Sequence, residues 1–81
     1  MDSRRNKKIY DLLIELQKRG EAFNKMVGTL YSGICADEIN TILNKLKRNY
    51  NVEVSYYQWI PGRIEFNNLE SLIKTYSPCT F

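Results

Sequence analysis

The chain has 81 residues, of which 43% are hydrophobic and 26% charged, and its net charge is +3. This length suits one domain with a modest core. Histidine, the commonest general acid or base near neutral pH, is absent, and the sequence has neither a Gly-x-Gly-x-x-Gly motif nor a phosphate loop. We therefore expect no enzyme activity, no cofactor and no small-molecule substrate.

The sequence holds no apolar run near the roughly 20 residues that a membrane helix needs. Its first residues, MDSRRNKK, are charged and polar, unlike the apolar segment of a signal peptide. We expect a soluble cytoplasmic protein with no membrane partner. Cys35 and Cys79 are too few for a four-ligand zinc site without carboxylates, so no metal is expected. Two unpaired thiols and one disulfide both remain open.

Basic residues are concentrated in part of the chain. Residues 1–25 hold seven Lys and Arg against four Asp and Glu, whereas residues 26–81 hold five of each. The basic patches are an N-terminal arm over residues 1–5 with Arg4 and Arg5, the following Lys7 and Lys8, and a cluster at Lys45, Lys47 and Arg48. Such patches suit a polyanionic partner, and they also serve solubility alone.

Two helices are predicted in the first part of the chain. A helix over residues 6–19 follows from the spacing of three and four residues between its apolar side chains, Ile9, Leu12, Leu13 and Leu16. Lys18-Arg19-Gly20 predicts its end, because cations in the last turn and a following glycine are typical of a helix stop. A shorter helix is predicted over residues 21–31, ended by Gly33 in a left-handed conformation.

The next predicted helix spans residues 36–50. Ile39, Ile42, Leu43 and Leu46 share its inner face, and Asp37 and Glu38 in its first turn suit the helix dipole. Its outward face carries polar and basic side chains, namely Asn40, Thr41, Asn44, Lys45 and Arg48.

From Val52 the apolar period changes to two, which predicts a hairpin with strands at residues 52–59 and 64–66 around Pro61-Gly62. A two-residue Pro-Gly loop would put Tyr57 and Trp59 on the face of Ile64 and Phe66. A longer loop or a bulge would put Val52, Val54 and Tyr56 there instead. We expect the longer loop, because Pro-Gly favours a type II turn, which splays hairpin strands.

A last helix is predicted after the hairpin. The run Asn67-Asn68-Leu69-Glu70 resembles a capping box, so either asparagine can be the N-cap. The apolar face consists of Leu69, Leu72, Ile73 and Tyr76. Ser77-Pro78 predicts the end of the helix and leaves residues 77–81 as a C-terminal tail.

The order of these elements resembles the winged helix-turn-helix family over residues 6–76. In that family a glycine and a following apolar residue join the two motif helices, and apolar residues five and eight positions further on hold the second helix to the core. Gly33, Ile34, Ile39 and Ile42 match this pattern, and Thr29 stands where a small residue is expected. Gly62-Arg63 matches the tip of the wing. The resemblance implies a small α+β fold of three helices, a β-hairpin wing and a C-terminal helix.

The resemblance also implies a small transcriptional regulator that binds double-stranded DNA. Residues 36–50 would enter the major groove as the recognition helix, and hairpin 52–66 would be the wing. Asparagine can pair with adenine, threonine can contact thymine, and cations neutralise phosphates. The DNA-binding residues would be Asn40, Thr41, Asn44, Lys45, Arg48, Arg63, Arg4, Arg5, Lys7 and Lys8. A homodimer through the first and last helices would place two recognition helices about one DNA turn apart.

Other interpretations of these residues stay open. Asp37 and Glu38 near phosphates would be unfavourable, and they would be harmless in a winged helix that docks on proteins. Tyr56, Tyr57 and Trp59 can stack on unpaired bases or cover the hairpin. The alternative function is therefore a protein-interaction module, an adaptor or an inhibitor of a host protein. The abundance of Lys, Ile, Tyr and Asn is typical of AT-rich genomes, among them those of viruses.

Overall fold

The computed structural model describes residues 3–25, 32–59 and 63–77. These residues form three helices and a two-stranded antiparallel sheet. In chain order the elements are α1 (Ser3–Lys25), α2 (Ser32–Tyr50), β1 (Tyr56–Trp59), β2 (Arg63–Phe66) and α3 (Leu69–Tyr76). The predicted α+β class, with a hairpin followed by a C-terminal helix, is confirmed.

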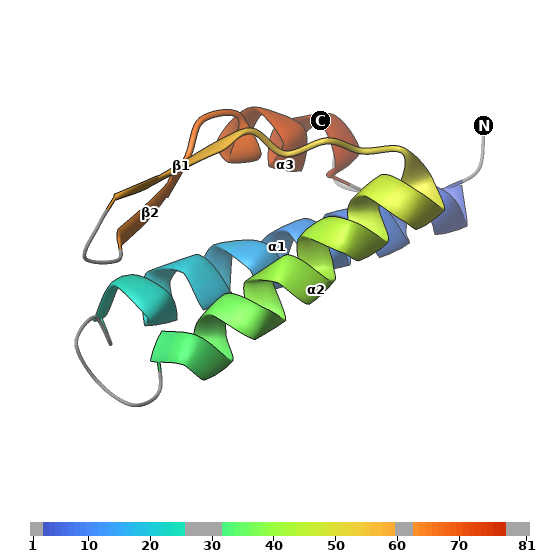
Figure 1. Cartoon of the computed structure of the whole chain (residues 1–81). Helices are drawn as coiled ribbons and strands as arrows, with labels where there is room; N and C mark the ends of the chain where they lie inside the picture. Colours follow the sequence, from blue (N-terminus) through green and yellow to red (C-terminus); the bar gives the residue numbers. More distant parts are fainter. Residues whose placement is uncertain (1–2, 26–31, 60–62, 78–81) are drawn as a thin grey trace.

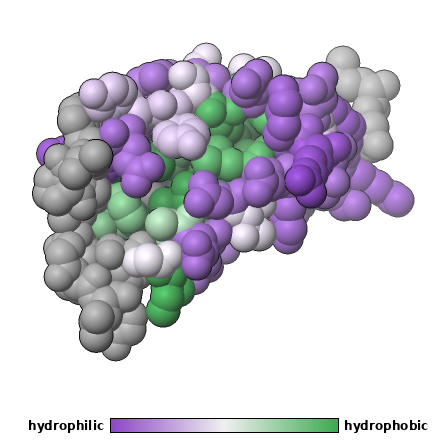
Figure 2. Space-filling view, viewed as in Figure 1, coloured by the Kyte–Doolittle hydropathy of each residue, from purple (hydrophilic) through white to green (hydrophobic). Residues whose placement is uncertain are grey.

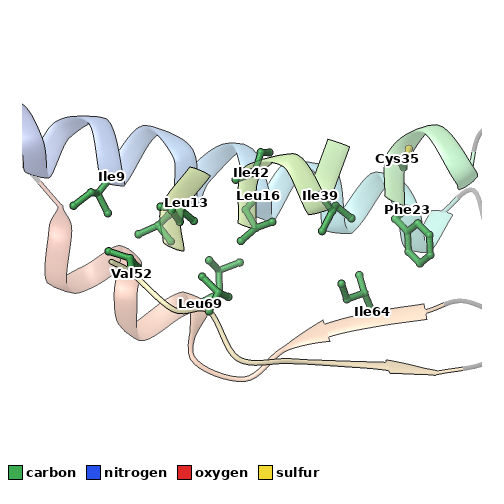
Figure 3. Close-up of a cluster of buried hydrophobic side chains, with 12 residues drawn as sticks. Ile9, Leu13, Leu16, Phe23, Cys35, Ile39, Ile42, Val52, Ile64 and Leu69 are labelled. Carbon is green, nitrogen blue, oxygen red and sulfur yellow. The ribbon is translucent and has the colours of Figure 1, made fainter. Parts of the chain in front are cut away.

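The described residues form two layers around one core. α1 and α2 lie side by side and run in opposite directions, and the hairpin and α3 lie over them (Figure 1). Figure 3 shows side chains of the helix pair directed toward Val52, Ile64 and Leu69 of the second layer. The buried side chains are Ile9, Leu13, Leu16 and Phe23 of α1, Cys35, Ile39, Ile42 and Leu46 of α2, and Val52, Val54, Ile64 and Leu69. Burying a large aliphatic side chain contributes roughly 1.5–3 kcal/mol, so these apolar stripes hold the layers together.

The predicted helix stop at Gly20 is wrong, because α1 continues through this residue to Lys25. A Cβ placed on Gly20 would lie 2.5 Å from Cε2 of Phe66, so the glycine allows that ring to approach the helix. The helix also starts earlier than predicted, at Ser3, so Arg4 and Arg5 are helical and do not form an arm. Of the predicted helix 21–31, the first five residues belong to α1, and residues 26–31 lie outside the described residues.

The predicted turn at Gly33 is also wrong, because α2 begins at Ser32 and Gly33 lies in its first turn. The first turn of α2 contains no acidic residue, and Asp37 and Glu38 come in the second turn. Since the helix dipole acts mainly on the terminal turn, it does not explain these two carboxylates.

Asn51 follows the last residue of α2 and ends the helix. The sequence pattern indicated no role for this residue. Asn51 has a φ of 55°, in the left-handed region that asparagine tolerates better than most residues. Its N–H donates to the Lys47 carbonyl at 3.1 Å, and the N–H of Val52 donates to the Leu46 carbonyl at 2.9 Å. These bonds satisfy carbonyls at the end of the helix and direct Val52 into the core.

The expected longer hairpin loop is confirmed by the register, in which Trp59 pairs with Arg63 and Gln58 with Ile64. The three residues between the strands lie outside the described residues. Val52 and Val54 are buried as expected, but they precede β1, which is shorter than the predicted strand. Tyr56 is exposed, although its ring meets that of Phe66 edge-on at 6.4 Å between centroids.

The predicted capping box before α3 is wrong. Asn68 holds the N-cap position, but its side chain makes no cap hydrogen bond. Its Oδ1 accepts from the Ser55 N–H at 2.8 Å, and its Nδ2 donates to the Glu53 carbonyl at 3.3 Å. The carboxamide thus ties the start of α3 to the extended segment before β1. α3 ends at Tyr76, and Ser77 is extended, as expected for a residue before proline.

Candidate nucleic-acid interface

Every side chain that the sequence assigns to DNA binding is exposed, but the structure distributes them over several surfaces. Asn40 and Asn44 flank a groove of about 220 Å³ between α2 and the segment that leads into β1, together with Lys47 and Tyr56. Thr41 and Lys45 line a different groove, of about 490 Å³, between α1 and α2. The predicted recognition face therefore spans two grooves with different walls.

The basic residues of α1 lie beside the basic end of α2. Figure 1 shows the start of α1 next to the end of α2. Lys8 and Lys45, 37 positions apart in the sequence, line one groove of about 340 Å³. We call this part of the molecule the basic end. Its cations are Arg4, Arg5, Lys7, Lys8, Lys45, Lys47 and Arg48.

Arg5 also has a structural role at the basic end. Its Nη2 donates to the Tyr50 carbonyl at 2.6 Å, and its guanidinium lies 5.8 Å from the centroid of the Tyr50 ring. A cation at the last carbonyls of a helix satisfies an orphan acceptor and opposes the negative end of the dipole. Arg5 therefore joins α1 to the end of α2, whatever else it contacts.

The net charge is concentrated at the basic end. Among the described residues, two carboxylates lie there: Asp11, 3.5 Å from Lys7 Nζ, and Glu53, 3.5 Å from Lys47 Nζ. Seven cations and two carboxylates give +5. The other halves of α1 and α2 carry three cations and four carboxylates, which give −1. Figure 2 shows hydrophilic side chains over most of the surface at the basic end.

Arg63 is not brought to the basic end. It opens β2, and Figure 1 shows the start of this strand over the end of the molecule where α1 ends and α2 begins. Glu38 lies in the same half of the helix pair, where its Oε2 accepts from Arg19 Nε of α1 at 2.5 Å. This ion pair between helices accounts for Glu38 without a role in DNA binding.

Sequence reasoning missed two features of the surface. Ile34 was assigned to the turn that joins two helices, but it lies on α2 with 56% of its surface exposed. Its offset from Ile39 and Ile42 on a helical wheel would have revealed this if the helix had been started at Ser32. The side chain of Asn24 bonds to both backbone groups of Ile64, a contact that leaves no local sequence signal.

Comparisons with protein-family models, curated proteins and solved structures find no match to this chain. In the described residues, no helix has the length and apolar character needed to cross a membrane.

Proposed function

We propose that this protein binds double-stranded DNA through the basic end and acts as a small transcriptional regulator. The observation that supports the proposal is the convergence of two basic segments, distant in sequence, on a part of the molecule whose described residues carry +5. Neutralising phosphates releases condensed counterions, and this term dominates non-specific affinity for DNA. A binding surface for a polyanion is the simplest reason to separate charge in this way in a chain whose total is only +3.

The proposed contact differs from the one that the winged-helix resemblance implies. That resemblance puts the N-terminal half of α2 in the major groove, where Asp37 and Glu38 lie. The charge distribution favours the C-terminal half, with Lys45 and Arg48 on phosphates and Asn44 between them and the base edges. Lys7, Lys8 and Arg4 would extend the phosphate contact along the duplex.

The proposal is tested by titrating the full chain into fluorescently labelled 25-base-pair duplexes of mixed sequence at several salt concentrations. If about four phosphates are neutralised, log K should fall with log salt at a slope of about −3.6, with dissociation constants of about 10 μM at physiological salt. Binding that is absent up to ~100 μM, or a slope near zero, would contradict the proposal. A preference for one duplex over the others would point to base readout by Asn44 and its neighbours.

A further inference from the structure

The groove between α1 and α2 carries an apolar surface on the side away from the hairpin. Leu12, Ile34 and Ile42 supply its apolar side chains, and its volume is about 490 Å³. Ile34 is 56% exposed, so it adds an apolar side chain to this part of the surface. The neighbouring groove shares Leu12 and Lys45 and adds Tyr50. Together they form one surface, here called the seam, that runs along α2 from Ile34 to Tyr50.

Charge along the seam is polarised. Near Ile34 it carries the carboxylates Glu15, Asp37 and Glu38 and one cation, Arg19, which pairs with both Glu38 and Glu15. Near Tyr50 it carries Lys8 and Lys45 together with Asp11, which lies 3.5 Å from Lys7, and Arg48 follows one helical turn after Lys45. The two apolar residues Leu12 and Ile42 lie between the acidic and basic halves.

We propose that a second copy of this chain docks on the seam, antiparallel to the first, around a two-fold axis near Leu12 and Ile42. In an isologous antiparallel dimer, a residue that lies some distance before the axis on one helix faces the residue that lies the same distance after the axis on the same helix of the other copy. On α2, Lys45 comes three residues after Ile42 and Glu38 four before it, so Lys45 faces the partner's Glu38. Arg48 lies six residues after Ile42 and Asp37 lies five before it, so Arg48 of one copy faces Asp37 of the other.

The remaining residues of the seam fit the same axis. Ile34 and Tyr50 are each eight residues from Ile42, so the exposed isoleucine of one copy lies at the partner's Tyr50. On α1, Lys8 lies four residues before Leu12 and Glu15 lies three after it, so Lys8 of one copy faces Glu15 of the other. A parallel arrangement would place basic side chains opposite basic ones and acidic side chains opposite acidic ones, which is repulsive. The charge pattern therefore selects the antiparallel second copy as occupant.

The sequence predicts a dimer through the first and last helices, whose additional apolar side chains are Tyr10, Ile14 and Tyr76. These three side chains are half-buried, whereas Ile34 is exposed on the seam. The seam is thus the better supported dimer face. The inference does not rest on DNA binding, but a second copy would cover Lys45 and Arg48, so dimer formation and the proposed DNA contact compete.

Charge reversal tests the seam by sedimentation equilibrium of the full chain over a range of concentrations. Asp37 and Arg48 are exposed and take part in no ion pair that the described residues show, so Asp37→Arg and Arg48→Asp should leave the fold intact. Because each change acts twice in an isologous dimer, either variant should weaken the dimer roughly tenfold or more. The double variant Asp37→Arg/Arg48→Asp should restore it. Lys18→Glu, on the outer side of α1, is the matched control and should change nothing.

Oxidative cross-linking gives a second measurement that does not depend on charge. In a chain with Cys35→Ala and Cys79→Ser, Thr41→Cys lies beside the axis and should form a disulfide between copies. Thr75→Cys on α3 is its control, because both threonines are exposed and donate to the carbonyl four residues earlier at 2.9 Å. Asp37→Arg also separates this inference from the proposed function, since it should disrupt the dimer without weakening DNA binding.

A chain that stays monomeric up to ~1 mM would overturn the inference. So would a dimer that ignores both reversals, or equal cross-linking at positions 41 and 75. Capture of a different protein on the seam, with no self-association, would equally exclude the second copy as its occupant.

Discussion

The two ends of the α1–α2 pair are built differently. Where α1 ends, Gly20 and Asn24 hold the hairpin: the glycine admits the Phe66 ring, and the carboxamide bonds to the N–H of Ile64 at 2.8 Å and to its carbonyl at 2.9 Å. Where α1 begins, exposed cations gather, and the Arg5 side chain donates to the Tyr50 carbonyl at the end of α2. The first end fixes the position of the hairpin on the helix pair, and the second is the surface that we propose binds DNA.

The largest effect on stability should come from Gly20→Leu. Its side chain would have to occupy the space of the Phe66 ring, and overpacking of this kind costs about 3 kcal/mol, more than the helix propensity of leucine returns. Urea unfolding followed by circular dichroism measures the change. Phe66→Ala in the same chain should recover part of the loss, and additive effects of the two substitutions would show that the contact is not decisive.

A smaller loss is expected from Asn24→Ala, which leaves the N–H and carbonyl of Ile64 without their partner. Unsatisfied backbone groups that are partly buried cost about 2 kcal/mol, and the outer edge of β2 would also be opened. Hydrogen exchange should show faster exchange at the Ile64 amide in particular. The control is Gln17→Ala, an exposed carboxamide on the same helix, which should change stability little.

The smallest effect on stability should come from the basic end. Lys45→Gln/Arg48→Gln removes two exposed charges, and such changes usually alter the free energy of unfolding by less than about 0.5 kcal/mol. The same urea series measures it. A loss comparable to that of Asn24→Ala would mean that these cations serve the fold, and the contrast between the ends would fail.

Features that depend on local sequence could be predicted, whereas contacts between distant residues, such as those at the end of α1, could not. Apolar stripes such as Ile9, Leu13 and Leu16 depend on local period alone, so these core positions and the expected longer hairpin loop were predicted correctly. Lys18-Arg19-Gly20 reads locally as a helix stop, and only Phe66, 46 residues away in sequence, gives the glycine its packing role. A contact between residues so far apart in the sequence, such as that of Gly20 with Phe66, depends on tertiary packing, which overrides local helix propensity.

The sequence predicted the parts of the candidate interface but not their arrangement, because the arrangement also depends on tertiary structure. The basic residues near the start of the chain and those near residue 48 were recognised as separate patches. Their merger depends on the antiparallel arrangement of α1 and α2, which the predicted stop at Gly20 and turn at Gly33 concealed. Ile34 was misplaced by the same turn, which hid the seam.

The most direct test of the central claim compares DNA binding by two variants with equal loss of charge. Lys45→Gln/Arg48→Gln removes two cations from the basic end, and Lys18→Gln/Lys25→Gln removes two from the rest of α1. At 100 mM salt the first variant should bind mixed-sequence duplexes roughly tenfold more weakly, with a salt slope reduced by about 1.8, and the second should lose less than about twofold. Equal weakening by both variants would contradict a DNA interface at the basic end.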